Sequence, residues 1–125
     1  MNNNHGVTLA ELLIAIFVLS VGVLSALLFF TNAMIATELA RDITVATSDA
    51  EGILEEMQTR SSLANVTSTD WTTWAQGQGL NTLPSETYNV YFVNAASDPL
   101  DITTTVGWTK KGRSNTVVLK TMLTK

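Results

Sequence analysis

The sequence predicts an α+β fold in which one long N-terminal helix packs on a small C-terminal antiparallel sheet. Three observations support this prediction. A run without a charged residue extends from Leu12 to Asn32, an amphipathic helical pattern continues to Arg60, and strand-like segments fill the last third of the chain. No proline occurs between Met1 and Leu83, so one helix is expected to run from about Val7 to about Arg60, roughly 80 Å in length.

The first half of this helix is apolar enough to lie in a membrane. The segment from Leu12 to Phe30 spans about 28 Å as a helix, close to the thickness of the hydrocarbon core of a bilayer. Within it, Gly22 and Ala26 are one helical turn apart, a small-xxx-small spacing that lets a second helix approach closely. We therefore name these two residues as candidate subunit contacts.

A conventional secretory signal peptide is the alternative interpretation of this segment. Cleavage would then fall near Ala33, where Thr31 and Ala33 are the small residues that flank the site. Signal peptides have a basic first region and an apolar core of roughly 7–15 residues. The stretch before Gly6 contains no Lys or Arg, and the apolar run is longer than that core. A membrane-spanning helix fits the sequence better.

The second half of the helix is expected to be amphipathic. Its charged residues, Asp42 and Asp49 among them, mostly occupy the faces away from an apolar stripe. Such a stripe needs a packing partner outside the helix. The residues that form it recur at steps of three and four: Ile35, Leu39, Ile43, Ala46, Ala50, Ile53 and Met57.

A polar stretch from Ser61 to Glu86 is expected to connect the helix to the sheet as a loop. It is rich in Ser, Thr, Asn and Gly, which are typical of turns. Trp71 and Trp74 lie within it. We expect both rings to close the core beside the end of the helix, the alternative being an exposed contact for another subunit or a ligand.

Three segments carry strand patterns: Tyr88 to Val93, Ile102 to Trp108 and Thr116 to Leu123. The connector from Lys110 to Asn115 is expected to form the loop of a hairpin. It contains the bases Lys110, Lys111 and Arg113, whereas six acids and two bases lie between Glu38 and Arg60. This asymmetry makes the three bases candidate contacts to an acidic surface on a neighbouring subunit. The alternative is a solvated turn that keeps the sheet edge from aggregating.

Composition argues against several classes of function. The 125 residues include no cysteine, and the single histidine is His5. We therefore predict no catalytic residue, no metal site and no cofactor, and a hydrolase lacks a credible pair of nucleophile and base. The net charge of −4 and the absence of a recognition motif argue against nucleic-acid binding.

The stretch Gly6-Val7-Thr8-Leu9-Ala10-Glu11 places one carboxylate at the head of the apolar run. A carboxylate in a bilayer costs roughly 2.5–3.5 kcal/mol on insertion scales, so a specific partner is expected. The stretch resembles the prepilin leader of type IV pilins and type II secretion pseudopilins. That resemblance implies cleavage after Gly6 by a prepilin peptidase, N-methylation of Val7, and pairing of Glu11 with the N-terminal amine of a neighbouring subunit.

The same resemblance divides the chain into a leader (1–6), a transmembrane or filament-core half of the helix (7–33) and a globular domain outside the cytoplasm (34–125). It implies an inner-membrane subunit that an assembly platform builds, with other pilin subunits, into a pilus or pseudopilus. The segments Val106 to Thr109, Val117 to Thr121 and Ala50 to Met57 are similar to the minor pilins called type IV pilus modification protein V and to I-type pseudopilins.

We therefore expect a minor pilin or pseudopilin without enzymatic activity. A major pilin is the alternative within the same class. A single-pass, membrane-anchored binding module that never polymerises is the alternative from a different class. Glu11 distinguishes the pilins from the membrane-anchored module, because an anchor needs no acid at that depth.

Overall fold

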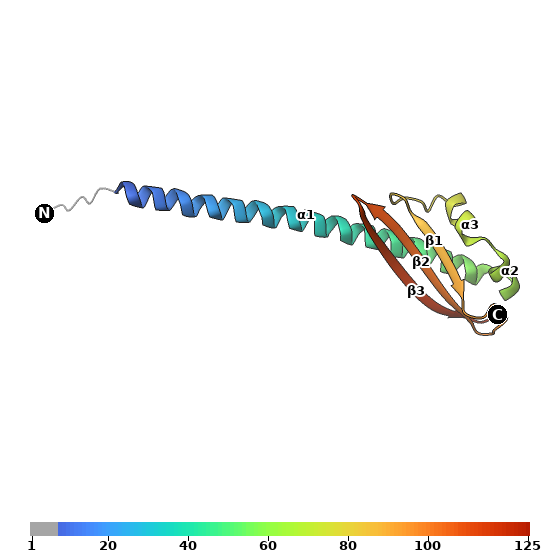
Figure 1. Ribbon diagram of the computed structural model, residues 1–125. Coiled ribbons are helices and arrows are strands. Elements are labelled where there is room, and N and C mark those ends of the chain that lie inside the picture. The colour runs from blue at the N-terminus through green and yellow to red at the C-terminus, as the bar shows by residue number, and fades with distance from the viewer. Residues whose placement is uncertain (1–7) are drawn as a thin grey trace. The chain divides into compact units, whose positions relative to one another are not determined.

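The computed structural model describes residues 8–125 (Figure 1), and the chain divides into two compact units, one ending at Leu39 and the other beginning at Ala40. Helix α1 (Leu9–Thr59) contributes to both units. The predicted cleavage residues Gly6 and Val7 lie outside the described residues. The predicted α+β fold is confirmed.

In the first unit, every side chain of α1 from Leu9 to Thr37 is exposed. The helix has no proline, and its hydroxyl side chains bond back to the preceding turn of their own helix. Ser20 Oγ donates to Ile16 O at 2.7 Å, and Ser25 Oγ donates to Val21 O at 2.8 Å. A hydroxyl bonded in this way needs no water, which is what an apolar surrounding requires.

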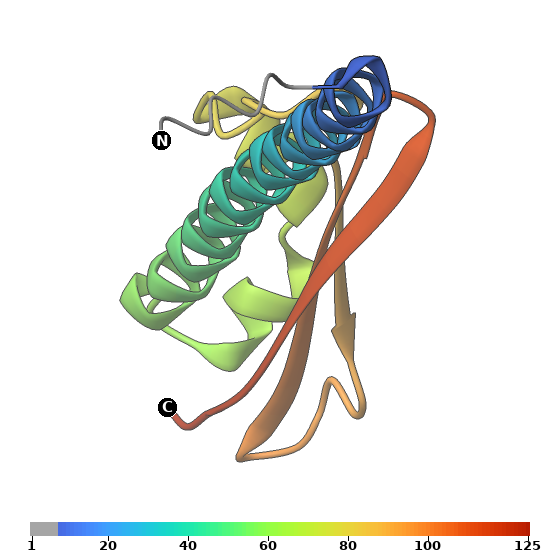
Figure 2. The same cartoon turned by 90° about the vertical axis from the view of Figure 1, so that its left-hand side faces the viewer.

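In the second unit, the C-terminal part of α1 lies along one face of a three-stranded antiparallel sheet (Figure 2), whose order is β1-β2-β3. The strands are β1 (Thr87–Phe92), β2 (Leu100–Lys110) and β3 (Arg113–Leu123). Alternate residues of β2 face the helix and are buried, because side chains along a strand point to opposite faces. The core is formed by the following residues of α1 and β2: Ala46, Ala50, Ile53, Met57, Leu100, Ile102, Val106 and Trp108.

The helical stripe is buried only in part. Ala46, Ala50, Ile53 and Met57 are fully buried as predicted, whereas Ile35, Leu39 and Ile43 remain about two-fifths exposed, at 41%, 39% and 42%. The assignment of Asp42 and Asp49 to outer faces is wrong, since both are buried, at 5% and 7% exposed. Both carboxylates are buried because polar side chains of the sheet region contact them, and the spacing of apolar residues along the helix gives no sign of these contacts.

The prediction that the stretch from Ser61 to Glu86 forms one loop is wrong. This stretch contains two short helices, α2 (Leu63–Ser68) and α3 (Trp71–Gly77). Ser62 caps α2 by accepting from Asn65 N, and Asp70 caps α3 by accepting from Thr72 N and Thr73 N. Residues such as Ser and Asp are favoured at this position because their side-chain oxygens satisfy orphan N–H groups.

Trp71 and Trp74 close the core beside the end of α1, which confirms the expectation for the pair. Trp71 is 3% exposed and its Nε1 donates to Val66 O at 2.8 Å. Trp74 is half-buried, with its ring centroid 5.6 Å from that of Trp71 in an edge-to-face arrangement. The Arg60 guanidinium lies 5.5 Å from the Trp71 ring centroid, within the range of a cation–π contact.

The hairpin between β2 and β3 is tighter than predicted. Lys110 pairs with Arg113, so the loop consists of Lys111 and Gly112 alone. Both residues have positive φ, at 52° and 75°. Two-residue loops with this backbone match the right-handed twist of the strands. Glycine at the second position has no Cβ, so it adopts positive φ without a steric cost.

Candidate processing and assembly site

The N-terminus of α1 is closed by a reciprocal pair of side chains. Glu11 Oε2 accepts from Thr8 N at 2.8 Å and from Thr8 Oγ1 at 3.0 Å, while Glu11 N donates to Thr8 Oγ1 at 3.2 Å. This is a capping box, in which the cap residue and the third helical residue satisfy each other's free N–H groups. Thr8 and Glu11 therefore define where the helix begins.

The role of Thr8 was missed by the sequence analysis, although the signal was present. Thr8-Leu9-Ala10-Glu11 has the spacing of a capping box directly before an apolar run. In the structure both bonds from Thr8 fall on Oε2, and no residue from Thr8 to Lys125 donates to Oε1. Among the described residues, the carboxylate keeps one oxygen available for a further partner.

The surface that follows Glu11 is apolar on all sides. Helix α1 has the length and hydropathy of a membrane-crossing helix, with a mean hydropathy of 2.9 over its most apolar window. A soluble helix shows one apolar stripe, whereas a helix that is apolar all round needs lipid or other helices around it. Gly22 and Ala26 are exposed on this surface, and a Cβ added at Gly22 would contact nothing within 4 Å. Their contact with a second helix stays a prediction.

The basic hairpin is tied to its own subunit. Lys110 Nζ donates to Asp42 Oδ2 at 2.8 Å and to Asp42 Oδ1 at 3.1 Å. Asp42 is nearly inaccessible, so this ion pair fastens the hairpin end of the sheet to α1. Lys111 and Arg113 are exposed in and beside the turn. Lys110 is engaged within its own chain, so Arg113 is better placed than Lys110 to reach a neighbouring subunit. The contact of Lys110, Lys111 and Arg113 with such a subunit stays a prediction.

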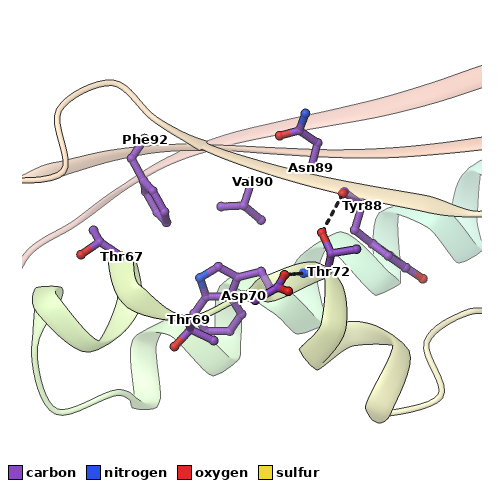
Figure 3. A pocket seen from close by; sticks show the side chains of 9 residues that line it. Thr67, Thr69, Asp70, Thr72, Tyr88, Asn89, Val90 and Phe92 are labelled. Atoms are coloured by element: carbon purple, nitrogen blue, oxygen red, sulfur yellow. Dashed lines mark hydrogen bonds between the residues drawn. The ribbon is translucent and has the colours of Figure 1, made fainter.

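A polar cavity of about 410 Å³ lies beside Trp71 and β1 (Figure 3). Its hydroxyl groups are used within the chain: Thr69 Oγ1 donates to Asn65 O at 2.7 Å, and Thr72 Oγ1 donates to Tyr88 O at 3.1 Å. Asp70 accepts from Thr72 N and Thr73, and the hydrogen bonds from Thr73 lower the pKa of Asp70. These groups serve helix capping and strand attachment, so we assign the cavity no ligand.

The described residues hold no group of three or more His, Cys, Asp or Glu side chains placed to bind a metal ion. The buried carboxylates of Asp42 and Asp49 belong to separate contacts. The capping box fixes the start of α1, and the apolar surface that follows it fits a surrounding of lipid or other helices.

Comparison with known families agrees with this geometry. Residues 1–27 match the family described as the prokaryotic N-terminal methylation motif. No curated protein and no solved structure gives a significant match to the chain. The motif indicates a substrate of prepilin peptidase and a structural subunit that assembles with other pilins, and the apolar helix fits anchoring in a membrane before assembly. The chain therefore carries the signature of type IV pilins and pseudopilins at the head of a pilin-like α+β fold.

Proposed function

We propose that the protein is a minor pilin or pseudopilin, cut after Gly6 and methylated on Val7. Residues 1–6 are the leader, residues 7–33 hold the subunit in the inner membrane and then in the filament core, and residues 34–125 form the globular domain outside the cytoplasm. The observation that supports this most directly is the methylation motif at residues 1–27, which leads into a helix whose entire first part is apolar and exposed.

Glu11 is central to the proposed assembly step. After cleavage, the α-amino group of Val7 is a cation with a reference pKa of about 7.7–8.0. In an apolar filament core neither this amine nor a carboxylate is stable alone, and loss of one partner of a buried pair costs about 3–5 kcal/mol. We propose that the amine of one subunit pairs with Glu11 of its neighbour, through the oxygen that the capping box leaves available.

The capping box gives Glu11 a second role that an experiment must separate from the first. Glu11→Gln retains an acceptor for Thr8 and so preserves the helix start, but it removes the charge. Glu11→Leu removes both. If charge pairing drives assembly, both variants insert in the membrane and fold, and both are depleted from sheared filaments relative to the membrane fraction by immunodetection.

The outcomes distinguish the proposed roles. A Glu11→Gln protein that enters filaments at the wild-type ratio, while Glu11→Leu does not, would show that helix capping rather than charge is what assembly requires. A Glu11→Leu protein in filaments at the wild-type ratio would rule out both roles. A wild-type chain that is never found in filaments would favour a membrane-anchored binding module.

The assignment as a minor subunit rests on the similarity of the C-terminal hairpin and the end of α1 to minor pilins. It is tested by stoichiometry. Quantitative mass spectrometry of purified filaments should find this chain at a small fraction of the most abundant subunit. A chain that makes up most of the filament mass would instead be a major pilin.

A further inference from the structure

Two carboxylic acids meet inside the globular unit. Asp49 comes from α1, and Glu86 directly precedes β1. Each is only 7% exposed, and the two side chains lie within hydrogen-bonding reach of each other. They join the helix to the sheet at a point where neither the apolar stripe nor the strand pattern predicts a polar contact.

The hydrogen bonds around the pair are incomplete. Glu86 Oε2 accepts from Leu83 N at 2.8 Å. Asp49 Oδ2 and Glu86 Oε1 are buried and have no hydrogen-bond donor among the described residues. Two ionised carboxylates with bare oxygens in a buried site repel each other and lose their hydration, so such a pair holds a proton between them.

Among the described residues, the faces of α3, β2 and β3 toward the pair carry one cation, which is bonded to another carboxylate. On β1, Tyr88 donates its hydroxyl to Leu80 O at 2.8 Å, and burial, followed by Glu86 and Asp49, raises the pKa of this phenol. Helix α3 contains no titratable residue, and the face of β2 toward α1 carries only Lys110, which is bonded to Asp42. The facing residues of β3, which alternate from Asn115 to Leu123, include no titratable group.

We propose that Asp49 and Glu86 share one proton and form a pH-sensitive latch between α1 and the start of β1. In the protonated state one carboxyl donates to the other, and the facing oxygens are satisfied. In the doubly ionised state the same oxygens repel at the centre of the contact. The latch concerns the globular unit alone and does not depend on whether the chain assembles into a filament.

The direction of the pH effect follows from Asp49. Burial, then the charge of Glu86 and the hydrogen bond with it, raise the pKa of Asp49 from 3.8 to about 6. A group whose pKa is raised in the folded state stabilises the fold fully below its unfolded pKa, and this stabilisation is lost as the pH rises through the folded value. The globular unit should therefore be more stable at pH 4 than at pH 7.5, with most of the loss falling between the ordinary pKa of 3.8 and the folded value of about 6.

The test is urea unfolding of the full chain in micelles of a neutral detergent, followed by tryptophan fluorescence at a series of pH values. All three tryptophans, Trp71, Trp74 and Trp108, lie in the globular unit and report its unfolding. Asp49→Asn is the informative variant, because its amide donates permanently to Glu86 and mimics the protonated acid. Relative to this variant, the unfolding equilibrium constant of the wild type should rise roughly a hundredfold between pH 4 and pH 7.5.

Asp101→Asn is the matched control, since Asp101 is an exposed acid on the outer face of the sheet. The ratio of the wild-type unfolding equilibrium constant to that of Asp101→Asn should not change over the same pH range. If Asp49→Asn fails to fold, Glu86→Gln supplies an amide donor from the other side of the contact. Carbon-13 NMR of the unmodified protein gives an independent readout, with one aspartate carboxyl titrating near pH 6.

Three results would overturn the proposal. One is a ratio of the wild-type unfolding equilibrium constant to that of Asp49→Asn that stays constant with pH. Another is an NMR titration in which every carboxyl of the globular unit ionises below pH 5. The last is a stability at pH 7.5 that rises with added calcium and falls with a chelator, which would show that the two carboxylates hold a cation rather than a proton.

Discussion

Replacing Lys110 by methionine tests whether the basic hairpin serves its own subunit. Methionine keeps the apolar stem and removes the ammonium group that donates to Asp42 at 2.8 and 3.1 Å. Asp42 is 5% exposed, so the carboxylate that remains cannot regain its hydration without moving. Breaking a fully buried pair costs about 3–5 kcal/mol. Because the Lys110 side chain is 26% exposed, the original pair is partly screened and we expect a loss of about 2–3 kcal/mol.

A double-mutant cycle separates the ion pair from the loss of a side chain. Asp42→Leu alone should cost less than Lys110→Met, about 1 kcal/mol, because the long lysine side chain can turn toward water. The double variant, with both partners apolar, should lie within about 1 kcal/mol of the wild type. Urea unfolding of the full chain in neutral micelles, monitored by tryptophan fluorescence, measures all three free energies.

Arg113→Met is the matched control, since Arg113 is an exposed base of the same hairpin. It should change stability by less than about 0.5 kcal/mol. The reasoning is refuted if Lys110→Met is as mild as this control, or if the double variant is as unstable as the sum of the single variants. Loss of filament incorporation with Arg113→Met, without loss of stability, would support the predicted contact of the hairpin with a neighbouring subunit.

Three further predictions concern processing, folding and the core. Intact-mass analysis of native protein should find a chain that begins at N-methyl-Val7, and a charged residue in place of Gly6 should leave precursor in the membrane; a start near Met34 would indicate signal peptidase instead. A shortened protein that begins at Asn32 should be soluble, monomeric and folded as α+β by circular dichroism and sedimentation, and a disordered product would contradict the packing of α1 on the sheet. Ile53→Ala should destabilise the globular unit by about 2–5 kcal/mol, because this fully buried side chain leaves a cavity, whereas a cost below about 1 kcal/mol would place it outside the core.

Local patterns in the sequence determined the main elements of this protein. The uncharged run, the helical stripe and the three alternating segments predicted a helix close to Leu9–Thr59 and strands that overlap β1, β2 and β3. Such predictions succeed because side-chain periodicity reflects the geometry of one helix or one strand. The methylation motif is local in the same way, since Gly6, Val7 and Glu11 lie within one short stretch.

The short helices α2 and α3 depended on tertiary contacts. An isolated helix of their length is marginal in water. Their caps at Ser62 and Asp70 were visible in the sequence, but the burial of Val66 and Trp71 against the core is what stabilises them. A polar stretch with weak periodicity therefore gave no reliable sign of them.

The buried acids were decided by the tertiary structure alone. On the helix, Asp42 and Asp49 look like solvated residues beside an apolar stripe. Their burial depends on Lys110, which is 68 residues along the chain from Asp42, and on Glu86 beside Asp49. A polar side chain enters the interior only where an opposite charge, as for Asp42, or a hydrogen bond, as for Asp49, offsets its lost hydration. The periodicity of one helix carries no information about which partner the sheet brings to it.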